Sequence, residues 1–231
     1  MWQQLVDAAP LFFRGVGVTV QYTIMGALGA FVLAFVFGLM ALSPWVAIRG
    51  LARTIVEFFR GTSLLVQLLW LYYALPLVGF QLTEMAAATL GLALNFGAYG
   101  SEIVRGAIVS VPKAQWEATV ALSLSPIQRM RRVILPQAIP EMLPPFGNLL
   151  VQMLKGSSLL YLISVTELTF EVQELRKDIG SLPAFGIALV VYFLMAQAFL
   201  VLMRWWEQRA SVKVGRGKVK KERVAEIGLG G

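Results

Sequence analysis

Polar side chains recur inside three long apolar stretches of the sequence, at spacings that place them together on a helix. Residues four and then three positions apart lie on one face of an α-helix. The sets are Ser63, Gln67 and Trp70; Asn95, Tyr99 and Glu102; and Asn148, Gln152 and Lys155. Polar groups are costly in hydrocarbon, so each face should meet the bundle interior, a dimer interface or water. Three such faces predict a lined path for a polar solute, and ordinary polar packing between helices is the alternative.

The sharpest interruption of an apolar stretch is Lys155-Gly156-Ser157-Ser158. It places a charge and a flexible glycine about 20 Å into a helix that starts near Glu141. Interrupted helices bind polar solutes in transporters through freed backbone groups and helix ends. Ser157 and Ser158 therefore join the candidate path. Alternatively, Lys155 pairs with Glu102 or extends its ammonium group toward the membrane interface.

Catalytic side chains are scarce. The chain has no His and no Cys, which excludes disulfides and thiolate metal sites and removes the commonest metal ligand and general base. It also has no G-x-x-x-x-G-K-[ST] phosphate-binding loop, so we expect no ATP hydrolysis by this chain. The sequence predicts a protein that is not an enzyme and needs no cofactor or metal.

The elements that position these residues are apolar helices. Of 231 residues, 58% are apolar and 14% charged, whereas soluble domains have about 45–50% and 25%. Five stretches are long enough to cross a bilayer as helices, which predicts an all-α integral membrane protein. They are residues 16–42, 54–77, 84–108, 139–165 and 184–204. We expect one transmembrane domain over residues 1–210 and a basic, disordered cytoplasmic tail over 211–231.

The basic residues predict the orientation of the chain. The segments 43–60, 105–137 and 204–231 together hold 16 of the 20 Lys and Arg residues. Short loops rich in Lys and Arg stay in the cytoplasm. We therefore expect the N-terminus outside and the C-terminus in the cytoplasm. The net charge of +7 is then a topology signal, and no nucleic-acid partner is expected.

The loop over about residues 110–137 is polar and basic. Ser110 or Pro112 can start a helix of about three turns, with an apolar stripe at Trp116, Val120 and Leu124. Ser125-Pro126 can cap a second helix, which Pro136 and Pro140 are expected to end. Two short helices joined at a capped corner form a rigid projection.

This loop resembles the signature loop of ABC-importer permeases, Glu-Ala-Ala-x3-Gly-x9-Ile-x-Leu-Pro. The matching positions are Glu117, Ala118, Thr119, Ser123, Val133, Leu135 and Pro136. Thr119, Ser123 and Val133 stand where the pattern has Ala, Gly and Ile. The resemblance implies that the loop, around Glu117, is the docking place of a separate ATPase.

The resemblance covers residues 55–180 and narrows to the polar amino-acid uptake group, the permeases for histidine, glutamine and arginine, with an opine or ectoine branch. The similar segments are 59–68, 99–108, 110–118, 135–138, 144–148, 155–159 and 163–168. It implies a type I ABC importer fold in a bacterial inner membrane. It also implies two ATPase copies, a second permease chain (sibling or self) and an external substrate-binding protein.

Other function classes remain open at this point. An ion-coupled secondary transporter or channel usually shows internal repeats, which are not evident here, and an acidic coupling site, for which Glu102 is the candidate. A membrane enzyme would need a catalytic constellation, for which a chain without His and Cys offers few side chains. The charged segment 167–178 is either a solvated external loop or a docking place for the binding protein.

Overall fold

The computed structural model describes the backbone of residues 2–213 and the side chains of residues 9–209. This part of the chain is helical and contains no strand, which confirms the all-α fold. The expected tail over 211–231 lies almost wholly outside the described residues. The α-helices are α1 (Trp2–Ala41), α2 (Val46–Gly61), α3 (Leu64–Leu69), α4 (Glu84–Val109), α5 (Lys113–Ala121), α6 (Pro126–Arg129), α7 (Leu135–Gly156), α8 (Leu168–Ile179) and α9 (Ser181–Lys213).

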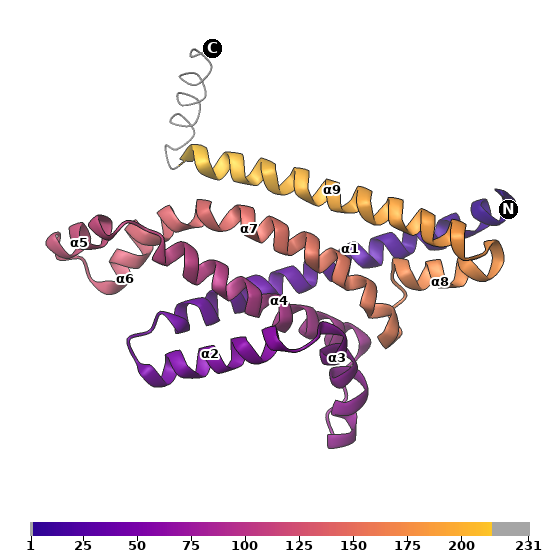
Figure 1. Cartoon of the computed structure of the whole chain (residues 1–231), viewed down its shortest axis with the longest axis horizontal. Helices are drawn as coiled ribbons and strands as arrows, with labels where there is room; N and C mark the ends of the chain where they lie inside the picture. Colours follow the sequence, from indigo (N-terminus) through magenta and orange to yellow (C-terminus); the bar gives the residue numbers. More distant parts are fainter. Residues whose placement is uncertain (1, 214–231) are drawn as a thin grey trace, which may run out of the picture.

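Four shorter helices complete the element order. The π-helix η1 (Trp70–Ala74) and the 3₁₀-helix η2 (Leu75–Val78) continue α3. The π-helix η3 (Met130–Ile134) joins α6 to α7, and the 3₁₀-helix η4 (Ser157–Ile163) follows α7. The molecule is elongated, with α5 and α6 at one end and α8 at the opposite end (Figure 1).

The centre of the bundle is the packing of α1 on α4. Small residues let the two backbones approach: a Cβ added at Gly29 would lie 2.8 Å from the Cβ of Ala93, and one at Gly97 would lie 2.8 Å from the Cβ of Leu33. Both distances are shorter than real carbon contacts, so these positions need glycine. Small residues in the first span therefore serve close helix contact.

Three helical segments in the described part are long and apolar enough to cross a bilayer, over residues 9–41, 126–163 and 181–209. A fourth is possible if α2 and the helix over 64–78 form one bent span. Helix α4, of 26 residues, lies mostly buried among the other helices, so small and polar residues replace the lipid-facing apolar ones. The number of five spans stays a prediction.

The segment expected as the second span, 54–77, is bent and not straight. Helix α2 ends at Gly61 and α3 starts at Leu64, and the chain bends by 101° between them. Thr62 and Ser63 between them have extended backbones. The arm of α3, η1 and η2 consequently projects from the side of the bundle (Figure 1).

Pro136 and Pro140 do not end the second helix of the loop, contrary to the expectation. The chain runs from α6 through the π-helix η3 into α7 without a break. Pro136 directly follows the π-helix η3, and the helix continues through it into α7. Pro140 lies inside α7, so the helix tolerates a missing hydrogen bond there.

Candidate coupling and translocation sites

The corner between α5 and α6 is fixed by a capping box. Ser125 Oγ accepts a hydrogen bond from the Gln128 backbone N–H at 3.4 Å, and the Gln128 side chain accepts one from the Ser125 N–H at 3.1 Å. Two backbone donors at the start of α6 are thereby satisfied. The cap expected at Ser125-Pro126 is confirmed.

Helix α5 divides into an inner and an outer face. Trp116 packs on the cluster around Ile134, and Thr119 is 1% exposed, with its hydroxyl donating to the Trp116 carbonyl at 2.6 Å. Glu117 and Ala118 are exposed. The signature position Thr119 therefore packs inward, while its two neighbours are available to a partner.

The expected apolar stripe on α5 is only partly buried. Val120 is 57% exposed, although Trp116 and Leu124 are partly covered. Two further apolar side chains, Leu122 and Ile127, are also largely exposed at this end. Exposed apolar residues beside Glu117 form a surface suited to protein contact. Leu135 and Pro136 start α7 behind it, with Leu135 packed inward and Pro136 exposed.

Ser123 adopts a left-handed backbone conformation, with φ of +52°. It follows α5 and lets the chain reverse toward α6. A left-handed conformation costs an L-residue about 1–2 kcal/mol, which glycine avoids. The signature loop has Gly at this position, and that difference was the signal that could have predicted the conformation.

Ser123→Gly should stabilise the chain. Relief of the left-handed strain exceeds the extra freedom that glycine gives the unfolded chain, so a net gain of about 0.5–1 kcal/mol and about 2 °C in Tm is expected. Tryptophan fluorescence during heating measures it. Ser110→Gly is the matched control, because Ser110 has φ of −71° and should lose stability. Equal losses in both variants would contradict the strain.

Three candidate path residues instead satisfy the backbone at the bend. Gln67 donates to the Phe59 carbonyl at 2.9 Å, and Asn95 donates to the same oxygen at 3.2 Å. Tyr99 donates to the Arg60 carbonyl at 3.2 Å. These carbonyls lost their helical partners because α2 ends at Gly61. Structural polar packing is therefore observed for Gln67, Asn95 and Tyr99, and their place along a path stays a prediction.

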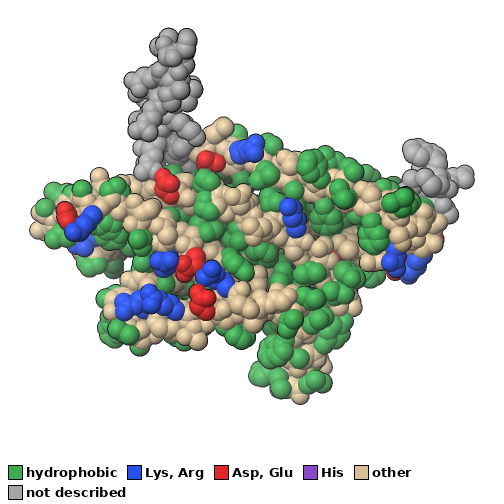
Figure 2. Space-filling model, in the orientation of Figure 1, with side chains coloured by type: hydrophobic (Ala, Val, Ile, Leu, Met, Phe, Trp, Pro, Cys, Tyr) green, Lys and Arg blue, Asp and Glu red, His purple; other side chains and the backbone are tan. Residues whose placement is uncertain are grey.

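Charged side chains from α2 and α4 gather on one side of the molecule. Glu102 pairs with Arg105 at 2.7 Å, and Glu57 pairs with Arg60 at 3.1 Å. Figure 2 shows acidic and basic side chains grouped over this region and surrounded by hydrophobic and other uncharged surface. Arg105 is the partner that the structure gives Glu102, so the alternative pairing of Glu102 with Lys155 is not observed.

The third polar face lies on α7. Asn148, Gln152 and Lys155 are all exposed, in a helical segment that is long and apolar enough to cross a bilayer. No ion pair of Lys155 occurs within residues 9–209. A charged side chain at this depth is costly in lipid, so this face requires water, a partner chain or a solute.

The expected interruption after Lys155 is a change of helix type. Helix α7 gives way at Gly156 to the 3₁₀-helix η4. The hydroxyls of Ser157 and Ser158 donate to the carbonyls of Leu154 and Lys155, each at 2.7 Å. A Cβ added at Gly156 would lie 3.1 Å from the Cδ2 atom of Leu64. Gly156 thus permits close packing, and both serines bond to their own helix.

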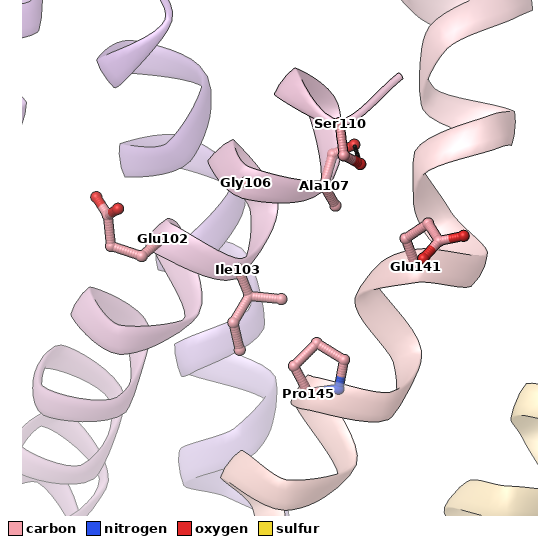
Figure 3. Close-up of a pocket in the computed structure, with 7 residues that line it drawn as sticks. All are labelled: Glu102, Ile103, Gly106, Ala107, Ser110, Glu141 and Pro145. Atoms are coloured by element: carbon pink, nitrogen blue, oxygen red, sulfur yellow. Dashed lines mark hydrogen bonds between the residues drawn. The ribbon is translucent and has the colours of Figure 1, made fainter. Parts of the chain in front are cut away.

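A cleft of about 450 Å³ separates α4 from α7 near the α5–α6 end. It is lined by Glu102, Ile103, Gly106, Ala107, Ser110, Glu141 and Pro145. Figure 3 shows Ile103 and Pro145 across the gap, while the carboxylates of Glu102 and Glu141 point in different directions. The carboxylates do not converge on one point, so this arrangement is a surface between helices and not a chelating site.

The family of the chain follows from its match to known proteins. A family model described as a binding-protein-dependent transport system inner membrane component matches residues 30–212. The chain belongs to this permease family. The matched range includes the α5–α6 loop and every candidate path residue, so the resemblance to ABC-importer permeases is confirmed.

Individual relatives agree. The permease is 44% identical over 207 residues to the probable amino-acid ABC transporter permease protein y4tF of Sinorhizobium fredii (strain NBRC 101917 / NGR234), which covers 83% of this chain and 87% of that protein. It is 33% identical over 215 residues to the glutamine transport system permease protein GlnP of Escherichia coli (strain K12), covering 91% and 98%.

Solved structures share the fold. The permease superposes on a crystal structure of an amino acid ABC transporter with histidines at a TM-score of 0.83 and 32% identity, covering 90% of this chain and 98% of that one. An inward-facing form of the MetNI methionine ABC transporter gives 0.76 at 19% identity, covering 87% and 96%. The second likeness is one of fold alone. The permease is thus membrane-embedded, with the importer fold expected from its sequence.

Proposed function

We propose that the permease is the pore subunit of a binding-protein-dependent ABC importer for a polar amino acid or an amino-acid-derived solute. The observation that carries the proposal is the capped α5–α6 corner, which exposes Glu117 and Ala118 at one end of a chain of this family. The amino-acid class is supported by the printed names of y4tF and GlnP. The binding protein sets which solute is delivered.

A separate ATPase, in two copies per complex, docks on the α5–α6 corner. The exposed apolar residues beside Glu117 provide contact area, and the carboxylate fixes the register. Helix α5 packs on η3, which continues directly into α7. A rigid-body movement of the ATPase is therefore passed into α7.

A second permease chain completes the pore. The charged patch of α2 and α4 and the polar face of α7 are unsuited to lipid, and a second chain or a water-filled path would cover them. A sibling is supported by y4tG, a second relative from Sinorhizobium fredii, 36% identical over 165 residues. The path follows Asn148, Gln152, Lys155 and Glu102, and Gln67, Asn95 and Tyr99 shape its wall.

The orientation proposed for the chain places the α5–α6 end in the cytoplasm. The basic residues of this end, Arg129, Arg131 and Arg132, follow the rule that Lys and Arg stay on the cytoplasmic side. The α8 end then faces outward, toward the binding protein. The membrane is the bacterial inner membrane, as the description of the family implies.

The deciding experiment is purification of the permease from native membranes in mild detergent, followed by mass spectrometry of the chains that accompany it. We expect an ATPase with a phosphate-binding loop and one similar permease; an ATPase alone would indicate a homodimeric pore. Uptake should need ATP and survive collapse of the proton gradient. A permease that purifies alone, with uptake abolished by that collapse, would contradict the proposal and favour an ion-coupled transporter.

A further inference from the structure

A fully buried carboxylate lies at the α8 end of the bundle. Glu167 is 0% exposed, although the sequence placed it in a charged external segment. It stands just before α8, where its Oε1 accepts a hydrogen bond from the Phe170 backbone N–H at 3.1 Å. Its segment neighbours Glu174 and Lys177 are exposed and pair with each other. The segment is therefore helix α8 and not a loop, and Glu167 is the charged residue of this segment that is fully buried.

The second oxygen of Glu167 connects α8 to two other helices. The Tyr192 hydroxyl of α9 donates to Oε2 at 2.9 Å, and the Thr19 hydroxyl of α1 lies 3.4 Å from it. The Thr19 hydroxyl also accepts from the Leu168 N–H at 3.0 Å. One carboxylate thereby ties the start of α8 to both α1 and α9.

Close packing excludes water from this junction. Leu168 and Val172 of α8 are 0% exposed and pack in one cluster with Leu154 of α7 and Ala184 of α9. On α1, a Cβ added at Gly15 would lie only 3.1 Å from the Cα of Leu168. The backbone of α1 thus lies directly against α8, and water can reach Glu167 only if α8 moves.

No cation compensates the charge of Glu167 within the described residues. Its contacts are the hydroxyls of Thr19, Thr169 and Tyr192 and backbone N–H groups. Tyr192 is the titratable group that faces it. Arg14 of α1 and Glu171 of α8 are charged groups nearby. Burial raises the pKa of Glu171, and the positive charge of Arg14 opposes this rise.

The protonation of Glu167 changes near neutral pH. Burial raises the pKa of Glu167 to about 7, and the hydrogen bonds that it accepts offset only part of the rise. Ionisation in a site without a cation is costly, because desolvation disfavours the charged form. A carboxylate that reached water would recover an ordinary pKa near 4.5.

We propose that Glu167 is a proton-controlled latch, which holds α8 against α1 and α9 while protonated and releases α8 when ionised. The proton passes to the surrounding water, and the freed carboxylate is solvated. The latch stands on the geometry of this junction and does not depend on which solute the permease carries.

The direction of the pH effect follows from proton linkage. Between the ordinary pKa and about 7, the closed junction holds a proton that the open one has lost. Rising pH therefore favours opening, and the stability that the latch contributes, full at low pH, is lost as pH rises through about 7. The equilibrium constant for opening should rise about tenfold between pH 6 and pH 8.

Thiol labelling tests the latch directly, because the chain has no cysteine of its own. Val172→Cys places a thiol at a position that is 0% exposed in the closed junction. Glu174→Cys places one at an exposed position of the same helix and reports the effect of pH on the labelling reaction itself. The complex purified from native membranes and reconstituted in lipid nanodiscs is labelled with a polar maleimide.

The ratio of the two labelling rates should rise about tenfold from pH 6 to pH 8, and Glu167→Gln should abolish the rise. Tyr192→Phe removes a hydrogen-bond donor to the ionised carboxylate, so it should move the rise to higher pH. If Glu167→Gln fails to assemble, the Tyr192→Phe variant tests the latch in its place. A ratio independent of pH in the unaltered background, or the same rise after Glu167→Gln, would overturn the latch. So would a rise that Tyr192→Phe leaves in place.

Discussion

Glu117→Lys is expected to reduce ATP-driven uptake at least tenfold while the permease still reaches the membrane. Glu117 lies on the outer face of α5, and its partner Lys113 lies 3.5 Å away, with the two side chains 66% and 90% exposed. An exposed pair of this kind contributes little to folding. The loss must therefore come from the surface of the ATPase, whose electrostatic potential complements a carboxylate and repels the lysine that replaces it.

The measurement is uptake in proteoliposomes together with the amount of ATPase recovered on the tagged permease. Glu174→Lys is the matched control, because Glu174 is also a half-exposed helical carboxylate paired with a lysine, at 2.6 Å from Lys177. It lies at the opposite end of the molecule and should leave ATPase recovery unchanged. Normal uptake by Glu117→Lys would remove Glu117 from the proposed ATPase contact.

Lys155→Met is expected to lower uptake at least tenfold without disturbing assembly of the complex. Methionine keeps the length and apolar stem of lysine and removes the charge. The structure shows no folding role for the ammonium group, since Ser158 bonds to the backbone carbonyl of Lys155 and not to its side chain. A charge retained at this depth without a pair among residues 9–209 points to a solute or a partner.

Uptake and the yield of intact complex, measured on the same preparation, separate transport from assembly. Lys155→Arg keeps the charge and should retain much of the uptake. Lys177→Met removes an exposed lysine of α8 and should leave the yield of intact complex unchanged. If Lys155→Met takes up solute at the rate of the unaltered permease, the α7 face is not the path.

The parts of the structure that could be predicted from the sequence are governed by local chemistry. Ser125 has a short polar side chain just before a proline, and such residues cap helices wherever they occur. Gly26 and Gly29 lie one turn apart in an apolar run, which indicates close helix contact. The signature loop was likewise recognisable, because its residues are contiguous.

The remaining features depend on residues that are distant in the sequence. The bend after Gly61 is stabilised by Asn95, which lies more than thirty residues away. The burial of Glu167 depends on Thr19, at a separation of 148 residues. The π-helix η3, from which the chain runs on into α7 past Pro136, is not indicated by any simple pattern of residues.

The glycine contacts between α1 and α4 have a consequence for the transport cycle. Added Cβ atoms at Gly26, Gly29, Gly97 and Gly100 would each lie 2.8 Å from a carbon of the facing helix. At each of these points a side chain of one helix lies against the bare backbone of a glycine in the other, so sliding would bring that side chain against a bulkier neighbour. The two helices should therefore keep a constant spacing during the transport cycle that the proposed importer function requires. The movements of this cycle must occur in joints elsewhere, and α1 with α4 serves as the fixed frame against which those movements can be measured.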